Sequence, residues 1–327
     1  NRLKIIMLKI TTMKKLFLFT SIIILTSTLV LPFYANAQFP DFTRIDTGTL
    51  VQLVIRGRGV YLVDLDGDSD LDLYIGNSTG YSFPGAVTGT NRPNMVYRNE
   101  RNNRFVMITE GILATKRYNT NPGNNWGDFD NDGDWDLFNH GELFVNEGFG
   151  NIEQIITIND KNEFCGTWAD YNSDGYLDIF TNVVGDNNYM YKNNGDGTFS
   201  EVSVGSPTAE GLGQSQSSAW GDCDNDGDLD IFEANVCVAS NTIYANKLYV
   251  NEGDGTFSSI DENSPLVADS MGAGGAAWGD YDNDGDMDIY VVSLFNSVNF
   301  LFKNNGDLNF EKIIIDPEEA YDKFTYG

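Results

Sequence analysis

The chain has 327 residues, of which 48 are Asp or Glu and 20 are Lys or Arg, so its formal net charge is -28 at pH 7. Such a charge argues against nucleic acid or an anionic membrane surface as the main partner, because their phosphates would repel it. Hydrophobic residues make up 41% and aromatic residues 13% of the chain, which is enough for a large core and excludes a polyacidic disordered segment.

The N-terminus has the features of a secretory signal peptide. From Met13 the chain has two lysines, an apolar run over residues 16–31, and the sequence Ala-Asn-Ala ending at Ala37. This order predicts cleavage after Ala37, with residues 1–37 forming an upstream segment and the signal peptide. A retained membrane anchor is the alternative, but the apolar run is shorter than the ~20 residues that a spanning helix needs. We expect a secreted protein, extracellular or at the cell surface, with the periplasm as the alternative and no membrane insertion after cleavage.

Nine-residue acidic segments recur five times in the rest of the chain. They are "DLDGDSDLD" from Asp64, "DFDNDGDWD" from Asp128, "DYNSDGYLD" from Asp170, "DCDNDGDLD" from Asp222 and "DYDNDGDMD" from Asp280. We call them loops 1 to 5 and number their residues as positions 1 to 9. Together they hold 23 of the 48 acidic residues. Two carboxylates ~4 Å apart repel by roughly 4 kcal/mol at an effective dielectric of ~20, so we expect each loop to need a cation.

The segments around the loops indicate β-strands. After each loop comes an alternating apolar stretch such as "LDIF" or "MDIY", and further on a glycine turn such as "NNGDGTF". A tryptophan precedes four of the loops: Trp126, Trp168, Trp220 and Trp278. A repeated four-stranded unit of roughly 40–60 residues is typical of a β-propeller blade. A solenoid of calcium-binding turns would need a period of about nine residues, whereas the loops start 64, 42, 52 and 58 residues apart.

The predicted fold class is therefore all-β, a β-propeller with five recognisable blades over residues 38–327. We expect a phenylalanine to open the fourth strand of a blade, since Phe105, Phe199 and Phe257 each lie 23 residues before the next loop, and Phe42 lies 22 residues before loop 1. We expect the strand at Phe42 to complete the last blade of a ring, which would remove exposed sheet edges. By the same spacing, Phe310 predicts a further loop near position 333, so we expect the sequence to end within an incomplete ring.

The donor atoms in the loops favour calcium. Oxygen donors without histidine or sulfur indicate a hard cation, and calcium accepts about six to eight oxygens in an irregular shell, whereas magnesium requires a stricter octahedron. We expect up to five structural calcium ions, each held by positions 1, 3, 5 and 9 around a glycine at position 6. The predicted ligands are Asp64, Asp66, Asp68, Asp72, Asp128, Asp130, Asp132, Asp136, Asp170, Asn172, Asp174, Asp178, Asp222, Asp224, Asp226, Asp230, Asp280, Asp282, Asp284 and Asp288.

Two loops depart from this pattern. Ser69 replaces the glycine in loop 1, and loop 3 has Asn172 at position 3 with three acids where the others have five. We expect loop 3 to bind calcium most weakly. Position 7 would offer its backbone carbonyl, so the side chain of Asp286 is expected to face solvent. An EF-hand is the alternative, since loop 4 has Glu233 at position 12, but the flanking segments alternate like strands.

Histidine and cysteine are too scarce for most other metal or catalytic sites. His140 is the single histidine, which argues against multi-histidine zinc sites and most histidine-based catalysis, and we expect it in a loop. Cys223 occupies position 2 of loop 4, which is aromatic in loops 2, 3 and 5. We therefore expect a buried thiol there, with a disulfide to Cys237 as the alternative.

The five loops, in phase with strands and glycine turns, resemble the FG-GAP or VCBS repeat family. That family includes the calcium-bearing blades of integrin α-subunit propellers and many bacterial surface proteins. The resemblance covers residues 42–327 and implies a β-propeller with calcium in the hairpin between the first and second strands of each blade. Members of the family serve in adhesion, in carbohydrate binding and as domains attached to enzymes, so the resemblance implies several functions.

Two functional hypotheses follow. The first is an adhesion or ligand-recognition module that binds a glycan or protein on the face formed by the variable loops. These include residues 77–95, with Tyr81, Phe83 and Arg92, and residues 234–246, with Tyr244. The alternative is a polysaccharide-active enzyme, a lyase or hydrolase. Its candidate acid and base are Glu110 and Glu210, which lie in predicted connections between blades.

Overall fold

The computed structural model describes residues 57–77, 94–101, 104–116, 124–148, 150, 152–158, 163–183, 186–203, 207, 215–235, 244–268, 272–294 and 299–313. These residues form five antiparallel sheets of four strands each. The prediction of an all-β fold built from four-stranded blades is therefore confirmed.

The sheets follow one another along the chain as blades 1 to 5. Blade 1 consists of β1 (Gly57–Val63), β2 (Asp72–Asn77), β3 (Met95–Asn99) and β4 (Phe105–Ile108). Blade 2 consists of β5 (Asn124–Gly127), β6 (Asp136–Asn139), β7 (Glu142–Asn146) and β8 (Ile152–Thr157). Blade 3 consists of β9 (Glu163–Ala169), β10 (Asp178–Val183), β11 (Tyr189–Asn193) and β12 (Phe199–Glu201). Blade 4 consists of β13 (Ser215–Gly221), β14 (Asp230–Asn235), β15 (Lys247–Asn251) and β16 (Phe257–Ser259). Blade 5 consists of β17 (Ala273–Gly279), β18 (Asp288–Ser293), β19 (Phe300–Asn304) and β20 (Phe310–Ile313).

Short helices lie in two of the connections between blades. α2 (Ile112–Thr115) follows blade 1 and α3 (Pro265–Ala268) follows blade 4. Within the described ranges, no helix has the length and apolar character that a bilayer span requires.

The strand order places all acidic loops at one end of the blades. Each sheet is a meander in which consecutive strands pair antiparallel. The acidic loops join the first and second strands and the glycine turns join the third and fourth strands. Both therefore lie at the same end of a blade, whereas the connections from second to third strands lie at the opposite end.

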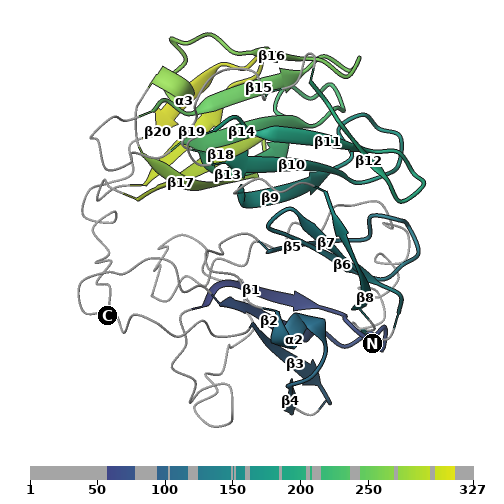
Figure 1. Ribbon diagram of the computed structural model, residues 1–327. Helices are drawn as coiled ribbons and strands as arrows, with labels where there is room; N and C mark the ends of the chain where they lie inside the picture. Colours follow the sequence, from purple (N-terminus) through teal and green to yellow (C-terminus); the bar gives the residue numbers. More distant parts are fainter. Residues whose placement is uncertain are drawn as a thin grey trace, which may run out of the picture.

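Neighbouring blades pack through their first strands. β5 lies against β9, β9 against β13, and β13 against β17. Figure 1 shows these strands on the inner side of an arc, with blades 1 and 5 at its two ends. In the described part of the chain this arc is open, so the architecture is an incomplete propeller.

The tryptophans before the loops belong to these blade interfaces. Each packs edge-on against an aromatic ring on the second strand of the preceding blade, with ring centroids 5.3–6.5 Å apart and interplanar angles of 72–88°. The pairs are Trp126 with Tyr74, Trp168 with Phe138, Trp220 with Phe180, and Trp278 with Phe232. Such aromatic pairs contribute ~0.5–1.5 kcal/mol beyond their buried area, so the repeated tryptophan stabilises the packing of one blade on the next.

The hydrophobic core lies between consecutive sheets. At the interface of blades 4 and 5, for example, Phe232 and Leu248 pack with Ile289 and Phe302, and all four are at most 1% exposed. Burial of each such side chain contributes ~1.5–3 kcal/mol. Because each blade completes the core of its neighbours, the positions of the loops are fixed by the stacking of the sheets.

The fold confirms some of the expectations, whereas others concern residues outside the described ranges. Cys223 is completely buried and carries a free thiol, as expected, whereas Cys237 lies outside the described residues. His140 lies in the turn between β6 and β7 with φ 56°. The signal peptide and the strand at Phe42 lie outside the described ranges, as does the chain beyond residue 313, so these stay predictions.

Candidate metal sites

Each acidic loop is folded around its own carboxylates. The aspartate at position 5 accepts, through Oδ1, the N–H of position 7 at 2.9–3.1 Å in all five loops. The aspartate at position 1 accepts, through Oδ2, the N–H of position 6 at 2.9–3.2 Å. These pairs are Asp64 with Ser69, Asp128 with Gly133, Asp170 with Gly175, Asp222 with Gly227, and Asp280 with Gly285.

Position 6 has a left-handed backbone, which explains the glycine there. Its φ is 97° at Gly133, 91° at Gly175, 98° at Gly227 and 99° at Gly285, a conformation that glycine adopts without a steric cost. Ser69 of loop 1 has φ 70°. Loop 1 therefore makes the same turn despite the substitution, at a cost of roughly 1–2 kcal/mol for a residue with a side chain.

Position 9, which we call the closing aspartate, ties each loop to its sheet. It is the first residue of the second strand and is at most 2% exposed in every blade. Its Oδ1 accepts the N–H of the last residue of the third strand at 2.7–2.9 Å. In loops 1, 2, 4 and 5 its Oδ2 also accepts the N–H of position 2 at 2.8–3.2 Å. The closing aspartates are Asp72, Asp136, Asp178, Asp230 and Asp288.

The last residue of the third strand is an asparagine in every blade, which we call the bridging asparagine. Its Nδ2 donates to the carbonyl of position 8 in its own blade at 3.0–3.3 Å. In blades 2 to 5 the same amide donates to the carbonyl of position 2 in the preceding blade at 2.6–3.2 Å. The bridging asparagines are Asn99, Asn146, Asn193, Asn251 and Asn304. Sequence reasoning assigned them only to the glycine turns, although their recurrence before each turn was the available signal.

Four loops bring three carboxylates together. In loops 1, 2, 4 and 5, one oxygen from each of positions 1, 3 and 9 lies within 4.8 Å of the other two. Oxygens at such separations can share one calcium ion at ~2.3–2.6 Å from each. The sets are Asp64, Asp66 and Asp72; Asp128, Asp130 and Asp136; Asp222, Asp224 and Asp230; and Asp280, Asp282 and Asp288.

Three of these loops contain buried carboxylate oxygens without a hydrogen-bond partner. Within the described ranges, the acidic loops hold four buried carboxylate oxygens that lack a hydrogen-bond partner: Oδ1 of Asp64, Asp66, Asp128 and Asp222. A buried carboxylate oxygen without a partner is costly. The donor set of loops 1, 2 and 4 therefore fits a hard cation, which would satisfy these atoms.

Loop 3 differs at position 3, as its sequence indicates. Nδ2 of Asn172 donates to Oδ2 of the closing Asp178 at 3.3 Å, and Oδ1 of Asn172 accepts the N–H of Asp174 at 3.0 Å. In loop 3 an amide N–H group therefore contacts the closing carboxylate, whereas in the other four loops the closing carboxylate lies near the carboxylates of positions 1 and 3. Nζ of Lys192 also pairs with Asp174 at 2.9 Å.

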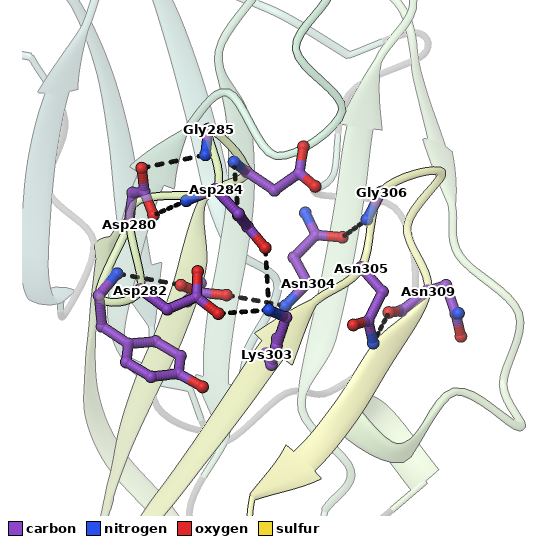
Figure 2. A network of polar contacts seen from close by, with 12 residues as sticks. Asp280, Asp282, Asp284, Gly285, Lys303, Asn304, Asn305, Gly306 and Asn309 are labelled. Carbon is purple, nitrogen blue, oxygen red and sulfur yellow. Dashed lines mark hydrogen bonds and ion pairs between the residues drawn. The ribbon is translucent and has the colours of Figure 1, made fainter.

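Loop 5 has a side-chain cation among its acids. Nζ of Lys303, on β19, forms ion pairs with Asp282 and with Asp284, the latter at 2.9 Å. Figure 2 shows the lysine pointing from the strand towards both carboxylates. The side chain of Asp286, which was expected to face solvent, is partly exposed, and its Oδ1 accepts from Asn225 of loop 4 at 2.7 Å in an exposed contact. Neighbouring loops therefore lie close enough to hydrogen-bond.

Burial raises the pKa of the closing carboxyls. The pKa rises from 3.8 to about 7 at Asp136 and Asp178 and to about 6 at Asp230, with loss of hydration as the main cause. Burial also raises the pKa of Asp130 and Asp224 at position 3, with the neighbouring aspartates adding to the effect. Each of these groups therefore favours an added positive charge, either a proton or a metal ion.

The residues of the alternative functions are described in part. Glu233 is 2% exposed within β14, where it interacts with Ser215 and Asn188. It belongs to a strand, so loop 4 is not an EF-hand. Glu110 is exposed in the connection between β4 and α2 and lines a pocket together with Asp66 and Asp72 of loop 1. Glu210 lies outside the described residues, so the pairing of the two candidate catalytic acids stays a prediction.

The predicted ligand-binding loops are described only in part. Tyr81, Phe83 and Arg92 lie outside the described residues, whereas Tyr244 is half-buried just before β15. The described strands on either side of these loops end and begin at the end of the blade opposite the acidic loops.

The fold and the loops define a β-propeller whose blades carry acidic hairpins. Two adjacent segments, residues 170–233 and 234–291, match the family model of the FG-GAP-like repeat. The chain therefore contains FG-GAP-like repeats, as the loop pattern predicted. No curated protein matches the chain significantly.

Two solved structures that match the chain are a lectin and a matrix protein. The Agrocybe aegerita lectin, described by its specific recognition of non-reducing terminal N-acetylglucosamine, is 18% identical with a TM-score of 0.52, over 80% of this chain and 67% of the lectin. The V. cholerae biofilm matrix protein Bap1 is 14% identical with a TM-score of 0.39, over 77% of this chain and 38% of Bap1. At such identities the similarity to the lectin concerns the fold alone.

Proposed function

We propose that this chain is a secreted, calcium-binding β-propeller that serves as an adhesion or ligand-recognition module. Calcium has a structural role in it, and a glycan or protein binds on the face of the variable loops. The observation that carries the proposal is the convergence of three carboxylates in a loop, with buried oxygens that lack partners in loops 1, 2 and 4.

Calcium is the cation that these donors suit best. The converging atoms are carboxylate oxygens, and the predicted signal peptide would deliver the protein to a compartment with millimolar calcium. At Kd values of ~0.1–1 mM, typical of extracellular modules, each occupied site adds roughly 0.4–1.4 kcal/mol to the free energy of unfolding. Several such sites add up to a large part of the stability of a domain.

Thermal unfolding of the full chain with and without calcium tests this role. We expect 5 mM EDTA to lower the melting temperature by roughly 5–15 °C relative to 1 mM calcium, because each kcal/mol shifts it by about 2–4 °C in a chain of this size. Magnesium at the same concentration is the control and should restore less stability. A melting curve unchanged by EDTA would show that calcium has no structural role.

Recognition of a glycan or protein is supported by the architecture. The connections from second to third strands lie opposite the acidic loops, and those over residues 77–95 and 234–246 are long and contain aromatic residues. Aromatic side chains beside Asn and Arg suit sugars and peptides. A glycan array that includes terminal N-acetylglucosamine, the ligand of the similar lectin, is the first screen.

Substitution in the variable loops tests where the ligand binds. Tyr81→Ala and Arg92→Ala should weaken binding of a hit from the array at least about tenfold, whereas Thr198→Ala, in the glycine turn at the opposite end, should leave the affinity unchanged. Equal affinity of all variants would refute the placement on the variable-loop face. For the enzyme alternative, Glu110 is the one candidate acid within the described residues, and its predicted partner Glu210 lies outside them.

A further inference from the structure

Three acidic loops have the same residue at every predicted ligand position. Loops 2, 4 and 5 read Asp-x-Asp-Asn-Asp-Gly-Asp-x-Asp and each holds five acids. They differ on the neighbouring third strand, in the residue just before the bridging asparagine. That residue is Val145 beside loop 2, Val250 beside loop 4 and Lys303 beside loop 5. The three loops therefore form a natural comparison in which one neighbouring side chain changes.

Lys303 places its ammonium group among the loop carboxylates. It pairs with Asp282 at position 3 and with Asp284 at position 5, as Figure 2 shows. The lysine side chain is 24% exposed, and the two carboxylates that it contacts are exposed.

The hydrogen bonds within the loops differ accordingly. In loops 2 and 4 the N–H of position 5 donates to the acid at position 3, at 3.4 and 3.3 Å, and Oδ1 of position 1 is buried without a partner. In loop 5 the N–H of Asp284 donates instead to Oδ1 of Asp280 at 3.1 Å. Oδ1 of the aspartate at position 1 therefore has a hydrogen-bond partner in loop 5 and none in loops 2 and 4.

We propose that Lys303 acts as a tethered cation that takes the place of a metal ion in loop 5, so that calcium binds tightly in loops 1, 2 and 4 and weakly in loop 5. This inference rests on the proposed calcium binding. A metal ion entering loop 5 must first displace the ammonium group from two carboxylates, whereas blades 2 and 4 have a buried, uncharged valine at the position of the lysine.

Blades 1 and 3 support the same division. In blade 3, Lys192 pairs with Asp174 of loop 3, so this loop also has its own cation. In blade 1, Arg98 occupies the same place on the third strand, but it pairs with Glu100, and Oδ1 of Asp64 stays without a partner. Arg101 does pair with an acid of loop 1, but that acid is Asp70 at position 7, which is not a predicted ligand. Loop 1 therefore belongs with loops 2 and 4.

Calcium titration of the full chain by calorimetry, after removal of bound metal, tests this assignment. Lys303→Met keeps the aliphatic stem and removes the charge, and we expect it to add one tight site, with affinity for loop 5 raised about tenfold or more. Val250→Lys makes the reverse change beside loop 4 and should remove one tight site. Lys312→Met is the matched control, since Lys312 lies on β20 with Nζ 4.0 Å from the ring centroid of Phe300 and should leave all sites unchanged.

The outcomes separate this inference from the proposed function. If the wild-type chain binds calcium but Lys303→Met changes neither the number of sites nor their affinities, the tethered-cation role is wrong and calcium binding stands. If neither the wild-type chain nor any variant binds calcium, both proposals fail. Circular dichroism establishes folding first, and if Lys303→Met does not fold, the loss or retention of a site in Val250→Lys decides the question.

Discussion

Loops 4 and 5 have the same donors on the same backbone frame and yet differ in charge environment. In both, position 1 accepts from the glycine at position 6, and the closing aspartate is at most 1% exposed with both oxygens hydrogen-bonded. In loop 4 a valine lies next to the bridging asparagine and Oδ1 of Asp222 has no partner. In loop 5 a lysine lies there and pairs with two acids.

This difference shows that the nine-residue motif determines the backbone conformation of a loop but not which cation balances its carboxylates. Two local hydrogen bonds, from position 6 to position 1 and from position 7 to position 5, come from the nine residues themselves and are shared by all five loops. The positive charge that balances the acids comes from outside those residues, from an ion or from the next strand. Predictions of metal content from the motif alone therefore treat loops 4 and 5 as equal, although their surroundings differ.

The largest expected effect is a reversal of pH dependence by calcium, because it sums over the loops. In the metal-free chain the closing carboxyls have pKa values of about 7 at Asp136 and about 6 at Asp230, above the ordinary 3.8. The folded state then binds more protons than the unfolded state, so the free energy of unfolding should fall as pH rises from about 4 to about 7. With saturating calcium, which requires deprotonated carboxylates, it should rise over the same range.

Urea unfolding at pH 4.5, 5.5 and 6.5, in EDTA and in calcium, measures both slopes. Equal slopes in the two conditions would mean that the buried carboxyls do not exchange protons for metal. Such a result would mean that the carboxylates of the loops do not need an added cation, and this need is the premise of the comparison between loops 4 and 5.

A second expectation concerns what loops 4 and 5 share. Asp230→Ala and Asp288→Ala each remove two acceptors from buried backbone N–H groups, and we expect each to lower the free energy of unfolding in EDTA by about 2–5 kcal/mol. Chemical denaturation measures the two losses, with Asp230→Asn, which keeps one acceptor, as the milder control. A loss in only one of the loops would contradict the conclusion that their frames are equivalent.

The smallest effect should come from the contact between the two loops. Asn225→Ala removes the bond from Nδ2 to Oδ1 of Asp286, and at this exposed position we expect a loss of about 0.5–1.5 kcal/mol. The calcium affinities of the other loops should not change. If the affinity of loop 4 changes along with that of loop 5, the loops are coupled and the occupancy of one depends on its neighbour.

Much of the architecture was predictable because the repeat carries it. Phe105, Phe199, Phe257 and Phe310 were expected to open fourth strands, and each is the first residue of one. Glycine at position 6 was expected from the sharp turn, and it has the left-handed φ that the turn requires. Regular alternation and turn chemistry act within a few residues, so a single sequence is enough to read them.

The contacts between blades were not predictable in the same way. Asn304 reaches Cys223 O, which is 81 residues earlier in the chain, and no local pattern indicates which carbonyl an amide will find. The role of Lys303 was missed for a similar reason. Its distance from the acids along the sequence conceals that β19 passes beside loop 5. Counting the acids within each loop predicts the weakest calcium binding for loop 3, but such a count leaves out charges that the fold brings from other strands.

The bridging asparagine gives the array of blades a direction. From blade 2 onwards, each blade donates from its third strand to the acidic loop of the blade before it and offers its own loop carbonyl to the blade after it. A single blade thus carries both the amide donor and the carbonyl acceptor of this contact. A tandem duplication of one repeat in the gene would insert a blade that fits its two neighbours at once, so the number of blades can change in evolution without any new interface.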